Sequence, residues 1–213
     1  MTLVTLGDSI TKGTYMADHE NSPNTIANPN FSDVLKELLG CEKLFNHGMN
    51  GTCISPNCRV FPQDAMCLRY QKMEDADIMI LAGGSNDFRC GVPLGTPSDT
   101  GEDTFYGAVD ILLKGLKKKY PNAELYMITP IHSKDEDTNS LGLSLTAYSD
   151  VLFKKAAEYG IPAIDGYEVP FNLHSDAHRK LYGKDGVHPN EAGHRLYGEY
   201  IYQCICIHRA SKK

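Results

Sequence analysis

The sequence predicts an α/β protein in which helices cover both faces of a five-stranded parallel sheet. Short apolar runs rich in β-branched residues alternate along the chain with longer amphipathic stretches, which is the pattern of repeated strand–helix units. One run, 78–82, reads Ile-Met-Ile-Leu-Ala and is typical of a strand buried on both faces. The chain has 213 residues without an internal repeat or linker, so we expect a single domain over residues 1–213.

The expected elements follow one another in strand–helix order. Apolar runs predict strands at residues 3–6, 43–46, 78–82, 125–129 and 161–165. Apolar residues at helical spacing predict helices at 31–39, 104–120, 146–159 and 190–207. Gly40 and Gly160 are expected to end the first and third helices, and Pro121 follows the second. Asn190 is a candidate N-cap for the last helix, on whose exposed surface we expect His194.

Two segments near opposite ends of the chain contain the residue types that acyl transfer needs: a hydroxyl, an imidazole and a carboxylate. Gly-Asp-Ser-Ile at 7–10 directly follows the first strand, and Asp-Gly-Val-His-Pro-Asn at 185–190 leads into the last helix. Asp185 and His188 are three residues apart, so one tight turn can hold both side chains beside Ser9. Each segment alone also fits an ordinary turn, because Gly, Asp and Ser favour turns. Together they predict a Ser9, His188 and Asp185 triad.

Two further segments can supply hydrogen-bond donors for the negative oxygen that forms when a nucleophile attacks a carbonyl. Segments 46–52 and 83–87 each follow an apolar run and place glycine where the backbone must turn or lie open. Gly51 can offer a backbone N–H and Asn86 a side-chain amide, beside the N–H of Ser9 at a strand-to-helix turn. Taken singly, Gly51 and Asn86 also fit ordinary loop chemistry.

These four segments, in this order, resemble the conserved blocks of the SGNH (GDSL-type) hydrolases. The blocks are Gly-Asp-Ser, Asn-x-x-x-x-Gly, Gly-Gly-x-Asn-Asp and Asp-x-x-His-Pro, and the resemblance extends from residue 7 to residue 188. It implies a three-layer α/β/α, flavodoxin-like SGNH hydrolase fold and a carboxylic ester hydrolase that uses no metal and no cofactor. By this resemblance Ser9 would be the nucleophile, His188 the base and Asp185 the residue that orients His188.

The resemblance also implies an oxyanion hole formed by Ser9, Gly51 and Asn86. Gly48 is a rival for the glycine of the second block. The block has four residues between its Asn and its Gly, and counting from Asn46 this spacing favours Gly51. The expected partner is a small-molecule ester.

Long loops are expected to form the substrate pocket. Segments 88–103, 130–145 and 166–184 each leave the carboxyl end of a predicted strand, where ligands of such sheets bind. Their side chains are mostly polar, which favours removal of a small acyl group such as acetyl from a polar alcohol or carbohydrate. A lysophospholipase or thioesterase is the alternative among enzymes. A catalytically silent glycan-binding protein on the same fold is the alternative outside them.

Several other classes of protein are disfavoured. No Gly-x-Gly-x-x-Gly follows the first strand and no Gly-x-Ser-x-Gly elbow occurs, which argues against nucleotide-binding and α/β-hydrolase folds. His174 and His178 have a spacing that can ligate a metal on a helix, but they lack the glutamate of His-Glu-x-x-His, so we favour solvated loop histidines. The net charge of −6 argues against nucleic acid as a partner, and no apolar run is long enough for membrane insertion.

The seven cysteines indicate a reducing compartment, because their number is odd and no Cys-x-x-Cys pair occurs. Cys53, Cys58 and Cys67 cluster after the second block, where a loop disulfide is the alternative to free thiols. No leader-like segment separates Met1 from Ser9, so we expect a cytoplasmic protein if Met1 is the natural start. A signal peptide removed before this point would leave the same sequence.

Overall fold

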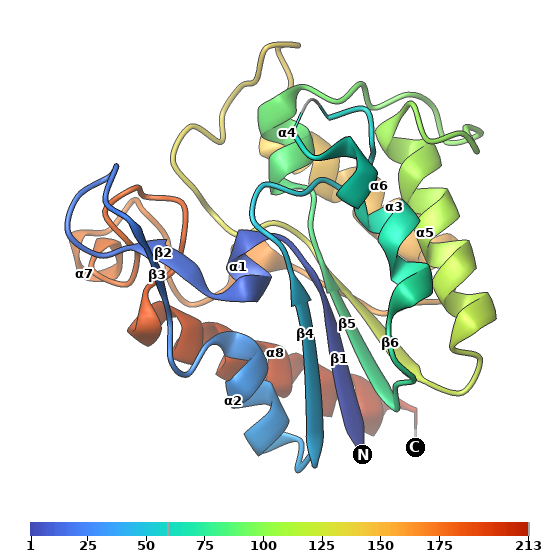
Figure 1. Cartoon of the computed structure of the whole chain (residues 1–213), viewed down its shortest axis with the longest axis horizontal. Coiled ribbons are helices and arrows are strands. Elements are labelled where there is room, and N and C mark those ends of the chain that lie inside the picture. The colour runs from blue at the N-terminus through green and yellow to red at the C-terminus, as the bar shows by residue number, and fades with distance from the viewer. Residues whose placement is uncertain (59, 213) are drawn as a thin grey trace.

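A computed structural model describes residues 1–58 and 60–212 and contains the expected parallel sheet (Figure 1). The strand order is β4-β1-β5-β6-β7, and all neighbouring strands are parallel. The strands are β1 (Thr2–Gly7), β4 (Lys43–Gly48), β5 (Ile78–Ala82), β6 (Glu124–Ile128) and β7 (Ala163–Ile164). Because β4 and β5 lie on opposite sides of β1, the strand order reverses next to β1. Ligands in sheets of this kind bind at that reversal, beyond the carboxyl ends of the strands.

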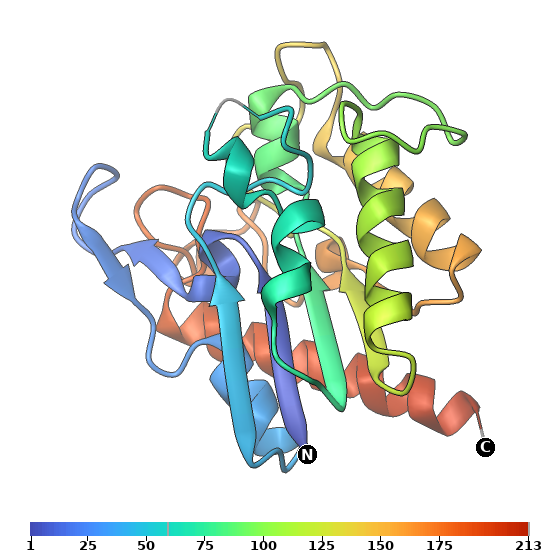
Figure 2. The same cartoon turned by 45° about the vertical axis from the view of Figure 1, so that its right-hand side comes forward.

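Helices cover both faces of the sheet, which gives the three-layer α/β/α architecture predicted from the sequence (Figures 1 and 2). One layer holds α3 (Met66–Arg69), α4 (Ser85–Cys90), α5 (Phe105–Lys119) and α6 (Leu145–Glu158), and the other holds α2 (Phe31–Leu38) and α8 (Glu191–Ser211). Val4 and Leu6 of β1 pack into the core on the α5 side, whereas Leu3 packs into the core on the α8 side. Burial on both faces explains why β5, whose five residues are all buried, is apolar throughout. Of the helices described, none combines the length and the apolar character required to cross a membrane.

Capping residues fix where the helices of the α8 layer begin. Asn30 starts α2 through a capping box that it shares with Asp33. Asn190, the N-cap expected from the sequence, accepts the N–H of Gly193 at 3.2 Å and starts α8. The turn that contains Asp185 and His188 therefore ends where a long, well-capped helix begins.

The structure differs from the sequence prediction in several short elements. An antiparallel hairpin of β2 (Thr14–Met16) and β3 (Asn24–Ile26) is absent from the prediction, because strands of three residues are too short to show a periodic pattern. β7 keeps two of the five residues expected at 161–165. The remaining short elements are α1 (Ser9–Lys12), η1 (Pro62–Asp64), η2 (Tyr70–Lys72), η3 (Gly166–Glu168) and α7 (Asp176–Arg179).

His194 is buried, so the expectation that it lies on the exposed surface of the last helix is wrong. The residue is 0% exposed, its ring stacks on that of Phe31, and its Nδ1 accepts the N–H of Phe31 at 3.3 Å. The physical reason is the close approach of α8 to α2. A Cβ at Gly198 would lie 2.7 Å from the Cβ of Val34, so the two helices enclose the imidazole between them.

Candidate active site

Ser9 lies at the turn between β1 and α1, at the carboxyl edge of the sheet. Gly7 ends β1 where there is no room for a side chain, because a Cβ there would lie 2.5 Å from the backbone oxygen of Ala82. Asp8 caps α1 by accepting the N–H of Ile10 at 2.9 Å. This turn places Ser9 in the wall of a cavity at the strand ends.

Ser9, His188 and Asp185 form a continuous hydrogen-bonded chain. Ser9 Oγ lies 2.7 Å from His188 Nε2, and His188 Nδ1 lies 2.5 Å from Asp185 Oδ2. The other carboxylate oxygen of Asp185 accepts the N–H groups of Val187 and His188 at 3.0 and 3.2 Å. Gly186 has a φ of +66°, which permits this tight turn. The structure thus places the three residues expected from the sequence in contact.

The protonation of Asp185 follows from two opposing effects. Burial raises its pKa, because a carboxylate loses hydration in the protein interior. The hydrogen bond and charge of His188, together with the backbone N–H donors, outweigh burial and hold the pKa of Asp185 below its ordinary value of 3.8. Asp185 is therefore an ionised acceptor for the imidazole at neutral pH.

A cavity of about 300 Å³ opens beside Ser9, and Gly51, Asn86 and His188 also line it. Gly51 has a φ of +73°, a backbone conformation that favours glycine. Asn86 Nδ2 donates a hydrogen bond to the backbone oxygen of Thr52 at 3.0 Å. An amide nitrogen has two hydrogens, so this bond uses one of them and fixes the direction of the other. The expected oxyanion donors thus share one cavity with the expected nucleophile.

Gly48, the rival glycine of the second segment, does not line this cavity. It is the last residue of β4, and a Cβ there would lie 2.1 Å from the backbone nitrogen of Lys12. Because Gly48 has no side chain, α1 can pack closely against β4. Asn46 supports the same junction, because its Nδ2 donates to a backbone oxygen of α1 at 2.7 Å and its Oδ1 accepts the N–H of Gly48 at 2.8 Å. The structure therefore places Gly51, and not Gly48, at the cavity.

Arg69 connects the strand ends to the loop around the cavity, and sequence reasoning missed it. Its guanidinium donates to the backbone oxygens of Gly7 and His47 at 2.6 Å each and to Thr52 Oγ1 at 3.3 Å. Burial lowers the pKa of Arg69 to about 10, and burial raises the pKa of Asp8, whose charge is attracted to Arg69. Arg69 is a positioning residue for the turn that leads to Ser9. Arg69 is the last residue of the short helix α3 and belongs to no motif, so no sequence pattern identifies it.

A second cavity of about 800 Å³ adjoins the first, and Met16 lines both. Lys134 of the second long loop and several residues of the third, between 173 and 184, line this larger cavity, as expected. Of the first long loop, which lies wholly within the described residues, only Arg89 lines either cavity. The expectation that this loop builds the pocket is therefore wrong for most of its length. The reason is that backbone oxygens of residues 93–94 accept N–H groups from the first turn of α5 and hold the loop there.

A group of metal-ligating side chains lies in the long loops, among the residues that the structure describes. It consists of His132, Glu136 and His174, whose ligand atoms lie within 4.8 Å of one another. His132 Nδ1 pairs with Glu136 Oε1 at 2.9 Å, and the other oxygen of Glu136 accepts the N–H of Ser133 at 2.9 Å. These hydrogen bonds account for the placement of His132 and Glu136, and His174 Nε2 lies 3.7 Å from Glu136 Oε1. His178 is not part of the group, so the histidine pair noted in the sequence does not assemble as a metal site.

Comparison with known proteins shows the family. Residues 5–196 match the model of the GDSL-like Lipase/Acylhydrolase family, and the chain belongs to this family. No curated protein matches the sequence.

Solved structures share the fold over nearly the whole chain. A protein of Lactobacillus plantarum is 30% identical, covers 97% of this chain and 97% of its own, and superposes with a TM-score of 0.83. An aryl esterase of M. smegmatis is 19% identical over 96% of this chain and 98% of its own, with a TM-score of 0.67. A carbohydrate acetylesterase family member from Sinorhizobium meliloti is 18% identical over 97% of each chain, with a TM-score of 0.68. The family and the fold predicted from the four segments are confirmed.

Proposed function

We propose that this chain is a serine carboxylic ester hydrolase that removes a small acyl group, such as acetyl, from a polar alcohol or carbohydrate. The observation that supports the proposal most strongly is the 2.7 Å contact between Ser9 Oγ and His188 Nε2, with Asp185 on the far side of the imidazole. A hydroxyl, a base and an orienting carboxylate in this order are what acyl transfer by a serine requires. Membership of an acylhydrolase family agrees with this chemistry.

In the proposed reaction, His188 Nε2 takes the proton of Ser9 Oγ as this oxygen attacks the ester carbonyl carbon. Asp185 accepts a hydrogen bond from the Nδ1–H of His188, which leaves the lone pair on Nε2 and stabilises the imidazolium that forms. His188 then gives the proton to the leaving alcohol, and the acyl group stays on Ser9. A water molecule repeats the sequence with His188 again as the base, which releases the acid and restores Ser9.

The negative charge that develops on the carbonyl oxygen requires donors that are already in place. We assign this role to the N–H of Ser9, the N–H of Gly51 and the side-chain amide of Asn86, which share the smaller cavity. The bond from Asn86 to the backbone oxygen of Thr52 holds the amide before any substrate arrives. Donors that need no rearrangement stabilise the transition state more than donors that must first be oriented.

The sizes of the two cavities favour a short acyl group and a larger alcohol. We assign the acyl group to the cavity of about 300 Å³ at Ser9 and the alcohol to the adjoining cavity of about 800 Å³. Lys134, Arg179, Lys180 and Lys184 line the larger cavity and suit a polar ligand. The Sinorhizobium meliloti protein named as a carbohydrate acetylesterase family member shares this fold, and the proposal extends its substrate class to this chain.

A lysophospholipase or thioesterase reaction is the second candidate. The observation that favours it is the size of the larger cavity, which has room for a long acyl chain and has Met16 and Leu173 among its apolar wall residues. The two candidates differ in which part of the substrate occupies this space.

A series of nitrophenyl esters from acetyl to dodecanoyl tests the proposal, with Ser9→Ala as the background control. The proposal predicts that kcat/KM is highest for the acetyl ester and falls as the acyl chain lengthens. A maximum at octanoyl or longer esters would support the second candidate instead. A wild-type protein that cleaves none of the esters above the Ser9→Ala background, but binds an acetylated glycan, would contradict the enzyme assignment.

A further inference from the structure

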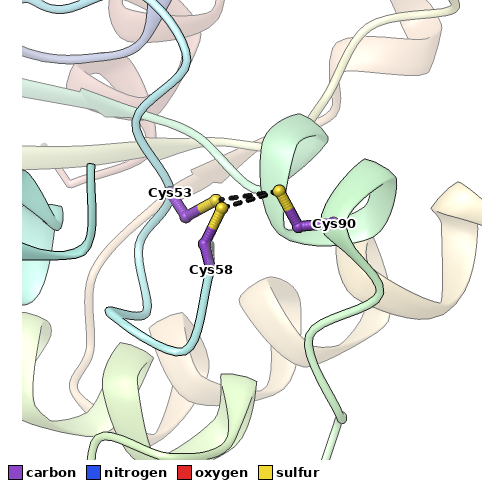
Figure 3. A group of neighbouring side chains, drawn as sticks. All are labelled: Cys53, Cys58 and Cys90. Carbon is purple, nitrogen blue, oxygen red and sulfur yellow. Dashed lines mark hydrogen bonds between the residues drawn. The ribbon is translucent and has the colours of Figure 1, made fainter. Parts of the chain in front are cut away.

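Three cysteine sulfurs lie together on the two segments that also contain Gly51 and Asn86 (Figure 3). Cys53 and Cys58 are in the loop after β4, and Cys90 is the last residue of α4. Cys58 Sγ lies 2.6 Å from Cys90 Sγ, and Cys53 Sγ lies 3.9 Å from Cys90 Sγ. This group differs from the cluster expected from the sequence, because the third member is Cys90 rather than Cys67, which helix packing buries elsewhere.

We propose that Cys58 and Cys90 form a thiol–disulfide exchange site, in which Cys90 attacks a small disulfide and Cys58 then closes an intramolecular disulfide with Cys90. Neither sulfur belongs to the acyl-transfer site, and neither residue lines its cavity. The proposal therefore stands or falls independently of the esterase activity.

The exposure and the pKa of each thiol indicate which one attacks the disulfide and which one closes the intramolecular bond. Cys90 is exposed and can meet a dissolved disulfide, whereas Cys53 and Cys58 are buried. The hydrogen bond from Cys53, and a smaller contribution from that of Cys58, outweigh the effect of burial and lower the pKa of Cys90 to about 6. Burial raises the pKa of Cys58. Cys90 is thus a thiolate at neutral pH, which is the form that attacks disulfides.

Distance selects Cys58 rather than Cys53 as the partner of Cys90. A disulfide requires the two sulfurs to come within about 2.05 Å, with their Cβ atoms suitably placed. Cys58 is already the nearer sulfur by a wide margin, at 2.6 Å against 3.9 Å for Cys53. Cys53 is left as the thiol that donates to Cys90 and stays reduced.

The reaction with oxidised glutathione balances in two steps. The Cys90 thiolate attacks one sulfur of the glutathione disulfide, forms a mixed disulfide and expels one glutathione thiolate. Cys58 loses its proton to water, attacks the Cys90 sulfur and expels the second glutathione thiolate. Two protein thiols are oxidised to one disulfide, and one glutathione disulfide is reduced to two glutathione thiols.

A metal–thiolate site fits this group less well. Two thiolates on one tetrahedral zinc ion lie about 3.8 Å apart, whereas the sulfurs of Cys58 and Cys90 are 2.6 Å apart. Within the residues that the structure describes, the group contains three ligand atoms, and a structural zinc site uses four. Exchange chemistry therefore accounts for the arrangement better than metal binding.

A bond between Cys58 and Cys90 would crosslink the loop that contains Gly51 to the helix that contains Asn86. These segments are already joined in the reduced state, because Asp87 accepts two backbone N–H groups of the loop at 2.9 and 3.0 Å. The crosslink therefore adds a restraint on the unfolded chain between residues 32 apart in sequence, without moving the cavity. We expect oxidation to raise the Tm by several degrees and to leave turnover nearly unchanged.

Non-reducing peptide mapping after incubation of the full chain with oxidised glutathione tests the site. The wild type should give a linked peptide that joins Cys58 to Cys90. Cys58→Ser should instead retain one glutathione on Cys90, because the resolving thiol is missing, and Cys90→Ser should acquire neither product at this site. Cys206→Ser removes another exposed cysteine, on α8, and as a matched control should still form the link.

The part assigned to Cys53 has its own readout. In Cys53→Ala the donor to Cys90 is lost, so the reaction with glutathione should slow at neutral pH. The pH at which its rate rises should then move upward, toward the ordinary thiol range near 8.5. An unchanged pH profile would remove Cys53 from the mechanism.

Three results would overturn the proposal as a whole. The first is a linked peptide that joins Cys53 to Cys90 in the wild type. The second is a chain that glutathione modifies at Cys206 while Cys58 and Cys90 stay reduced. The third is one zinc ion retained per chain that blocks oxidation of these cysteines until a chelator removes it.

Discussion

Asp185 Oδ2 lies 2.5 Å from His188 Nδ1, while the other oxygen of the same carboxylate is held by the backbone N–H groups of Val187 and His188. The carboxylate is therefore fixed within its own turn, whether or not a ligand is present. Because Nδ1 is engaged by Asp185, the imidazole presents Nε2 to Ser9. A short local turn thus sets the orientation of an imidazole that contacts a residue 179 positions away in the sequence.

Asp185→Asn should reduce turnover by about 10³- to 10⁴-fold, because an amide can favour the wrong imidazole tautomer. The amide oxygen of the new Asn can still accept the two backbone N–H groups, so the Tm should change little. Hydrolysis of nitrophenyl acetate and a thermal melt measure the two effects. Asp150→Asn is the matched control, because this carboxylate is exposed and lines neither cavity. Equal activity of the two variants would remove Asp185 from the mechanism.

Asn86→Ala should lower kcat by about 10²- to 10³-fold with a smaller effect on KM, because an oxyanion donor acts mainly in the transition state. Steady-state kinetics on the acetyl ester separate the two parameters. Asn122→Ala, a matched change at an exposed position that lines neither cavity, should leave kcat nearly unchanged. A large rise in KM with an unaltered kcat would show that Asn86 binds the ground state instead.

The predictable part of the site consists of short local motifs. Asp185 and His188 belong to one turn, and Ser9 follows a strand that its apolar run marks clearly, so their meeting follows once the sheet is parallel. Arg69 has no such pattern around it, and its structural role depends on hydrogen bonds to three acceptors from separate segments. The contact between Cys58 and Cys90 likewise arises only when the loop after β4 folds against α4.

Arg69→Met should destabilise the protein by about 3 kcal/mol, because two backbone oxygens at the carboxyl ends of β1 and β4 lose a charged donor. Turnover at temperatures where the variant is folded should also fall, since Gly7 directly precedes the turn to Ser9. Urea unfolding and kinetics measure the two effects. Arg209→Met removes a surface ion pair with Glu124 and should change stability by less than about 1 kcal/mol. A similar small effect for Arg69 would contradict its positioning role.

His194 should make stability depend on pH between about 3 and 6.5. Burial, together with a smaller contribution from the charge of His188, lowers the pKa of His194 to about 3, from 6.5 in the unfolded chain. Below pH 6.5 the unfolded chain binds a proton that the folded chain does not, so the stabilisation is complete above 6.5 and is lost as the pH falls toward 3. Between pH 6.5 and pH 5 the free energy of unfolding should fall by about 2 kcal/mol because of His194.

Urea unfolding of the wild type and of His194→Gln at several pH values checks this linkage. The glutamine side chain has an acceptor for the N–H of Phe31 but does not titrate. The variant should therefore lose less stability than the wild type between pH 7 and pH 5. Parallel curves would show that His194 takes up its proton in the folded state.

The burial of His194 is a feature that the sequence pattern could not predict. Its place on α8 is compatible with an exposed helical face, and only the close packing of α8 on α2 encloses it. The β2–β3 hairpin is similar, because three-residue strands acquire their pairing from the surrounding fold rather than from their own sequence. The layers of the fold depend on long apolar runs, and these are the elements that the sequence predicts best.

Labelling with a fluorophosphonate, which reacts with activated serines whatever the natural substrate, tests the central claim most directly. We expect one adduct per chain on Ser9, found by peptide mapping. The adduct should be lost in both Ser9→Ala and His188→Ala, while the Tm values of these variants stay close to that of the wild type. A folded wild-type protein that takes up no label, or that is labelled equally well in His188→Ala, would contradict the claim that His188 activates Ser9.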